Sequence, residues 1–224
     1  MKTPLIGSKL LPAGWQAGDG ATLQVTCCDA SPQEFRKRAA ETLQHSWTRA
    51  SASSRSFPKQ CLRRGVGPRF GVVDQPVNQR IFWASSLSHS ASAEVVATAL
   101  WTQSVDSVRR SRRMTIGIDV ESSTRVVHPA VARLLAPREV QEADAVADGH
   151  VPLLAVICVK EAVFKADVRQ PGRVLADYAW VTSEQVGAAA WRGMVAAAQE
   201  RVARFEVRVA HTGGCWLAVA IGIL

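Results

Sequence analysis

Two apolar stretches of the sequence, TIGIDVE at 115–121 and VKEAVFK at 159–165, carry acids and lysines where core residues are expected. Carboxylate oxygens suit Mg²⁺, which usually takes one or two protein carboxylates and completes its coordination with water and substrate phosphates. Lysine ammonium groups bind phosphate oxygens. The two stretches together therefore indicate a site for a metal ion and a phosphate.

The first stretch belongs to a strand predicted over 114–121. Side chains alternate along a strand, so Asp119 and Glu121 share one face with Gly117, which leaves room for a ligand or another backbone. Two carboxylates so placed repel each other unless a cation or a basic group lies between them. Two interpretations stay open: the solvated acidic end of an edge strand, or a pair of Mg²⁺ ligands.

The second stretch ends a strongly apolar helix predicted over 152–168. Glu161 and Lys165 lie one turn apart on its apolar stripe, where an unpaired charge would cost on the order of several kcal/mol. Here too there are two interpretations. The two residues form a buried salt bridge, or both point into a polar cleft where Glu161 is a base or metal ligand and Lys165 holds an anion.

A third stretch, ASSLSHSAS at 84–92, holds five serines and a histidine before a strand predicted at 93–101. Hydroxyl groups, backbone amides and an imidazole can form a phosphate cradle, and the same composition is typical of a polar turn. A Ser–His hydrolase is not indicated, because the chain has no GxSxG motif.

The elements that must position these residues predict an α+β fold. We expect the strands 93–101 and 114–121 to pair as a hairpin. The other predicted elements are a helix at 32–47, two helical pieces within 128–147 that are broken at Pro137, a helix at 182–200, and a closing hairpin formed by 204–210 and 215–224.

The segments that start at His89 and His211 resemble each other: each has a histidine, a few small residues and a buried strand. Their separation, 211 − 89 = 122, is about half of the 224 residues. We therefore expect two similar lobes with pseudo-twofold symmetry, 1–113 and 114–224, with a boundary near Arg113.

Composition limits the possible partners. Net charge is +8 and hydrophobic residues make up 47%, which is typical of a folded domain that binds anionic partners. We expect no signal peptide, no membrane span and a cytoplasmic protein whose cysteines are buried thiols, above all Cys158 and Cys215.

The order LSHS, GIDVE, ICVKEAVFK resembles the motifs of the 4′-phosphopantetheinyl transferases: a Ser-His turn, a G-[IV]-D-[IV]-E strand and a [FW]-[STA]-x-K-E-[AS]-x-x-K helix. The likeness is to the larger, pseudo-dimeric kind that activates polyketide and nonribosomal peptide synthases. It implies a two-lobed α+β monomer with the site between the lobes. Such an enzyme uses Mg²⁺, moves the phosphopantetheine arm of coenzyme A onto a serine of an acidic acyl or peptidyl carrier protein, and releases 3′,5′-ADP.

The resemblance also implies roles for individual residues. Asp119, Glu121 and Glu161 would hold Mg²⁺, and Glu161 would also be the catalytic base. Lys165 would be the second catalytic residue, because it stabilises the pyrophosphate charge. The residues implied in coenzyme A binding are Arg38, Ser88, His89, Lys160 and Lys165.

The chain departs from the family pattern at three places. Gln75 precedes Pro76 where a lysine is common, Ile157-Cys158 replaces an aromatic residue and serine, and Ala91 stands where the form His-Ser-Gly has glycine. Two other functions compete with the transferase. The arginines of RRSRR at 109–113 and those from Arg55 to Arg69 suggest a nucleic-acid-binding protein, although no recognised binding motif accompanies them. The other competing function is that of a catalytically silent relative of the transferases, which only binds carrier proteins.

Overall fold

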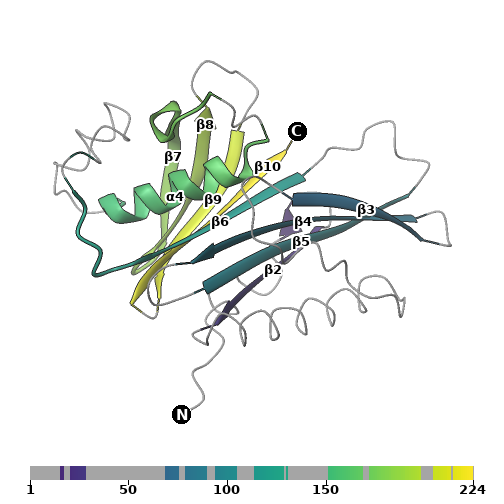
Figure 1. Cartoon of the computed structure of the whole chain (residues 1–224), viewed down its shortest axis with the longest axis horizontal. Coiled ribbons are helices and arrows are strands. Elements are labelled where there is room, and N and C mark those ends of the chain that lie inside the picture. Colours follow the sequence, from purple (N-terminus) through teal and green to yellow (C-terminus); the bar gives the residue numbers. More distant parts are fainter. Residues whose placement is uncertain are drawn as a thin grey trace, which may run out of the picture.

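The chain is built around two antiparallel sheets, seen in the computed structural model of Figure 1. In the part of the chain that the structure describes, each sheet has five strands and every strand pairing is antiparallel. The structure describes residues 16–17, 21–28, 69–75, 79–89, 94–104, 114–128, 130, 151–168, 172–197, 204–212 and 214–223.

The first sheet has the strand order β1-β2-β5-β4-β3. Its strands are β1 (Gln16–Ala17), β2 (Ala21–Cys28), β3 (Arg69–Gln75), β4 (Gln79–His89) and β5 (Glu94–Ser104). The strand predicted at 93–101 is confirmed as β5. The turn considered for 84–92 is wrong for its first six residues, because they continue β4 and pair with β5 from Ala84↔Ala99 to His89↔Glu94.

The second sheet has the order β6-β10-β9-β8-β7. Its strands are β6 (Met114–Ser122), β7 (Tyr178–Gly187), β8 (Ala190–Ala197), β9 (Arg204–Thr212) and β10 (Cys215–Ile223). Helix α4 (Leu153–Ala166) packs against one face of this sheet, in front of it in Figure 1. The second sheet and α4 together form one unit, called the second unit below. This unit confirms the α+β class, the strand 114–121, the apolar helix and the closing hairpin.

The predicted hairpin between the strands 93–101 and 114–121 is wrong. Both edges of β5 are taken, by β2 on one side and β4 on the other. Strand β6 pairs instead with β10, with Ile118 opposite Val219, and forms the outer edge of the second sheet. Its other edge lies against β4 of the first sheet (Figure 1).

The predicted helix at 182–200 is also wrong, because these residues form most of the hairpin β7–β8. In β8 the side chains of Trp191, Val195 and Ala197 are buried, which is the two-residue alternation of a strand. Trp191 and Val195 are four residues apart, and that spacing fits both a helix and a strand. The packing of these side chains in the core with α4 outweighs the helical propensity of the alanines in this segment.

The core of the second unit lies between α4 and the sheet. The helix supplies small side chains, among them Ala155, Ala162 and Ala166, each fully buried. The sheet supplies larger ones, such as Phe205 and Val207, from the same face. The helix can therefore approach the strands closely.

Two of the predicted buried thiols are confirmed, because Cys158 and Cys215 are both buried. The helix predicted at 32–47 and most of the helical pieces within 128–147 lie outside the described residues. None of the helices in the described part of the chain has the length and apolar character that a membrane span needs.

Gly117 of β6 lies directly against Ala162 of α4. A Cβ atom on Gly117 would lie 1.9 Å from the backbone oxygen of Ala162. Glycine at this position therefore serves the close approach of another backbone, one of the two uses that the sequence left open.

We expect Gly117→Ala to lower the free energy of unfolding by about 2 kcal/mol or more, because the methyl group forces α4 away from β6. Urea denaturation measures this loss. Gly187→Ala is the matched control, since a Cβ there meets only Ala190 Cβ at 3.5 Å. Equal stability of the two variants would contradict the close packing of helix on strand.

Candidate metal centre

The carboxylates of β6 face helix α4. Gly117, Asp119 and Glu121 share the face against which α4 packs, and Asp119 and Glu121 are buried, with 2% and 9% of their surface exposed. The interpretation of a solvated acidic end is therefore wrong, although β6 is an edge strand as that interpretation supposed.

Helix α4 brings a third carboxylate to the same place. Glu161 is half-buried and precedes Ala162, one of the two helix residues whose backbone lies against Gly117. One carboxylate oxygen from each of Asp119, Glu121 and Glu161 lies within 4.8 Å of the others. Two segments that are distant in the sequence thus form one acidic group.

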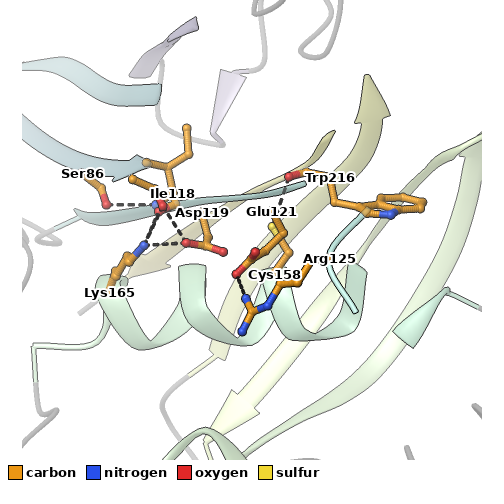
Figure 2. A network of polar contacts seen from close by, with 9 residues as sticks. Ser86, Ile118, Asp119, Glu121, Arg125, Cys158, Lys165 and Trp216 are labelled. Atoms are coloured by element: carbon orange, nitrogen blue, oxygen red, sulfur yellow. Dashed lines mark hydrogen bonds and ion pairs between the residues drawn. The ribbon is translucent and has the colours of Figure 1, made fainter. Parts of the chain in front are cut away.

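Lys165 lies one turn beyond Glu161 and reaches β6. Its Nζ forms an ion pair with Asp119 Oδ1 at 2.6 Å and donates a hydrogen bond to Ile118 O at 3.3 Å (Figure 2). It also donates a hydrogen bond to Ser88 Oγ at 2.9 Å. The lysine therefore pairs with the strand acid, and not with Glu161 as the interpretation of a buried salt bridge within the helix supposed.

Strand β4 contributes two hydroxyl groups from alternate residues. Ser88 Oγ donates a hydrogen bond to Asp119 Oδ1 at 2.7 Å. Ser86 Oγ accepts one from Ile118 N at 3.0 Å, and so satisfies a backbone donor on the edge of β6 that faces the first sheet (Figure 2). The two serines therefore join the two sheets at the acidic group.

The sequence patterns did not predict a further positively charged side chain at this site. Arg125, which follows the end of β6, forms an ion pair with Glu121 through its NH1 group (Figure 2). The signal available in the sequence was weak: a basic residue four positions after the acid, in a polar stretch where a basic residue is common.

Burial and the proximity of Asp119 change how Glu121 and Glu161 titrate. Burial, and then the negative charge of Asp119, raises the pKa of Glu161 from an ordinary 4.5 to about 7, against the opposing effect of Lys165. Burial and then Asp119 also raise the pKa of Glu121, against the opposing effect of Arg125. Both shifts reflect the cost of keeping like charges together in a partly dry site.

The acidic group fits a divalent cation. Asp119 Oδ2 is buried and has no hydrogen-bond partner among the described residues, although a buried carboxylate oxygen normally has one. Three carboxylates with an unsatisfied oxygen supply the hard ligands that Mg²⁺ prefers. Such an ion would also offset the repulsion that, after burial, contributes to the raised pKa values of Glu121 and Glu161.

The contacts described for Lys160 lie outside the acidic group. Its fully buried side chain donates from Nζ to Tyr178 O at 2.6 Å and to Leu175 O at 3.3 Å. These contacts tie α4 to the turn η4 (Leu175–Asp177) and the start of β7. The predicted role of Lys160 in coenzyme A binding finds no support in this position.

Two other predicted residues are not placed at the site. His89 is the last residue of β4 and pairs with Glu94, but its side chain lies outside what the structure describes. Arg38 lies outside the described residues altogether. Comparison with known proteins adds no further assignment, because no family model and no curated protein matches the sequence.

We expect the metal-free protein to lose stability as the pH rises from about 4.5 through about 7. In this window folded Glu161 keeps a proton that the unfolded chain has released, so the folded state binds more protons and the free energy of unfolding falls with pH. Urea denaturation in the presence of EDTA measures the slope, and Glu161→Gln should reduce it.

Excess Mg²⁺ should reverse the trend, because a bound cation favours the ionised carboxylates and releases their protons. The increase in melting temperature on adding Mg²⁺ should therefore be larger above pH 7 than below pH 5. An increase that is independent of pH, or the same for Glu161→Gln as for the unchanged chain, would count against a cation at these three carboxylates.

Proposed function

We propose that this chain is a Mg²⁺-dependent 4′-phosphopantetheinyl transferase. In the proposed reaction, the phosphopantetheine arm of coenzyme A passes to a serine of an apo acyl or peptidyl carrier protein. The observation that carries the proposal is the convergence of Asp119, Glu121 and Glu161, from the GIDVE strand and the KEAVFK helix, within 4.8 Å. The motif resemblance predicts this set of ligands.

In this proposal the three carboxylates hold Mg²⁺, which when bound would neutralise charge on the diphosphate of coenzyme A. Glu161, ionised beside the metal, is the proposed acceptor of the proton of the carrier serine hydroxyl. The serine oxygen forms a bond to the phosphorus that carries the pantetheine arm. The bond from that phosphorus to the oxygen of the nucleotide phosphate breaks, and 3′,5′-ADP leaves with the electron pair.

Lys165 and Ser88 are the proposed phosphate contacts beside the metal. The Lys165 side chain is 30% exposed, so its ammonium group can reach a ligand while it stays close to Asp119. The Ser88 hydroxyl, 2.9 Å from Lys165 Nζ, helps to orient this lysine. Arg38 and His89 remain proposed contacts of coenzyme A on the motif resemblance alone.

The topology supports two related lobes. In each sheet an early strand lies beside the last strand, and the strands before the last one follow in reverse chain order. This order is β2-β5-β4-β3 in the first sheet and β6-β10-β9-β8 in the second. Strands β5 and β10, which contain the strand parts of the two similar segments, take equivalent second positions in this order. The described strands up to residue 104 all belong to the first sheet, and those from residue 114 onward all belong to the second. We infer a pseudo-twofold fold with the site where Ser88 of one lobe meets Asp119 of the other.

The net charge of +8 suits an acidic carrier protein as the partner. The buried thiols of Cys158 and Cys215 suit a reducing cytoplasm. The arginines at 109–113, which suggested nucleic-acid binding, lie outside the described residues. No described contact favours that function over the transferase.

The proposal predicts that the purified chain adds a phosphopantetheine mass to an apo carrier protein when Mg²⁺ and coenzyme A are present, and adds none in EDTA. Glu161→Ala should reduce the rate by at least about a hundredfold, because it removes a ligand and the base. Intact-protein mass spectrometry of the carrier measures both.

Glu184→Ala is the matched control, since Glu184 lies on β7 with a side chain that is 60% exposed. It should transfer at the unchanged rate. Binding of coenzyme A and carrier without any mass added to several carriers would indicate the silent relative instead. Binding to DNA or RNA that weakens steeply with salt, without a response to coenzyme A, would indicate the nucleic-acid-binding protein.

A further inference from the structure

The ion pair between Arg125 and Glu121 holds a carboxylate that the candidate metal centre needs. Arg125 NH1 binds Glu121 Oε1, and Glu121 offers one of the three clustered carboxylates. A guanidinium group and a divalent cation that contact the same carboxylate repel each other, so they compete for its charge. Metal binding at this group therefore has to weaken the contact of Arg125 with Glu121.

The net charge of the acidic group and its two basic side chains indicates which partner Arg125 would bind after a metal displaces it. With all three carboxylates ionised, the acids carry −3 while Lys165 and Arg125 together carry +2, so the group without a metal then has a net charge of −1. A divalent cation changes this to +1. The group then attracts an anion, and a phosphate is a favoured partner of a guanidinium group, whose planar fork binds two oxygens at once.

The position of Arg125 allows such an exchange. Its side chain is 43% exposed, whereas that of Glu121 is 12% exposed. The residues around it, Ser123, Thr124 and Val126, are exposed and follow the end of β6. The guanidinium group can thus turn from the buried carboxylate toward solvent without disturbing the packing of α4.

We propose that Arg125 exchanges partners: it holds Glu121 while no metal is bound, and binds a phosphate of the diphosphate substrate once a divalent cation takes Glu121. This inference rests on the proposed function and adds to it a residue that competes with the metal and then binds the substrate. Arg125 therefore weakens metal binding when no substrate is present, and strengthens substrate binding when metal is present.

The two effects have opposite signs, and Arg125→Ala separates them. Without coenzyme A, the variant should bind Mg²⁺ about threefold to tenfold more tightly than the unchanged chain, because a competing cation is gone. With saturating Mg²⁺, it should bind coenzyme A about tenfold more weakly, because one charge-assisted contact is lost. Isothermal titration calorimetry with MgCl₂ and then with coenzyme A measures both constants.

Two further variants control the experiment. Arg192→Ala removes an exposed arginine from an ion pair with Glu184 at 2.8 Å and should change neither constant. Arg125→Lys keeps the charge but loses the fork, so its affinity for coenzyme A should lie between those of Arg125→Ala and the unchanged chain.

Unchanged or weaker Mg²⁺ binding by Arg125→Ala would overturn the exchange, and so would unchanged binding of coenzyme A. Failure of the proposed function is a separate result, because it shows in the unchanged chain as no mass added to any carrier. A chain that modifies carriers equally well with alanine at position 125, at limiting coenzyme A, would keep the function and lose this inference.

Discussion

Strand β6 and helix α4 meet where Gly117 faces Ala162, at a distance that leaves no space for a side chain. This contact sets the spacing of the residues beside it. Asp119 stands two residues further along β6, and Glu161 stands one residue before Ala162 in the helix. Because the two backbones are packed together, the carboxylates stay together as well, and their repulsion contributes to the raised pKa values of Glu121 and Glu161.

The surroundings compensate this repulsion only in part. Lys165 neutralises one acid and Arg125 another, while Asp119 Oδ2 keeps no hydrogen-bond partner among the described residues. A packed core does not normally retain such an arrangement, since replacing buried charges by apolar groups is often neutral or stabilising. The arrangement is understandable if the site holds the ligands of a cation and of an anion, as the proposed transfer requires.

The edge of β6 that faces the first sheet links the two sheets at this point. An edge strand exposes unpaired backbone groups, and here Ile118 has its N–H bonded to Ser86 and its carbonyl bonded to Lys165. Lys165 also contacts Asp119, and so does Ser88, which lies two residues after Ser86 on β4. The contacts that satisfy the edge thus also hold the first sheet against the acidic group, so the site depends on both sheets.

Local patterns in the sequence determined strand β6, the apolar helix and the closing hairpin, because alternation and helical periodicity need only neighbouring residues. They also identified three acids and a lysine as charges that need partners. Only the tertiary structure decided which partner each one has: Lys165 pairs with Asp119 rather than with Glu161, and Arg125 pairs with Glu121. It also decided that β7 and β8 are strands and that β6 pairs with β10, because strand pairing and packing under α4 join residues far apart in the chain, where local propensity carries no information.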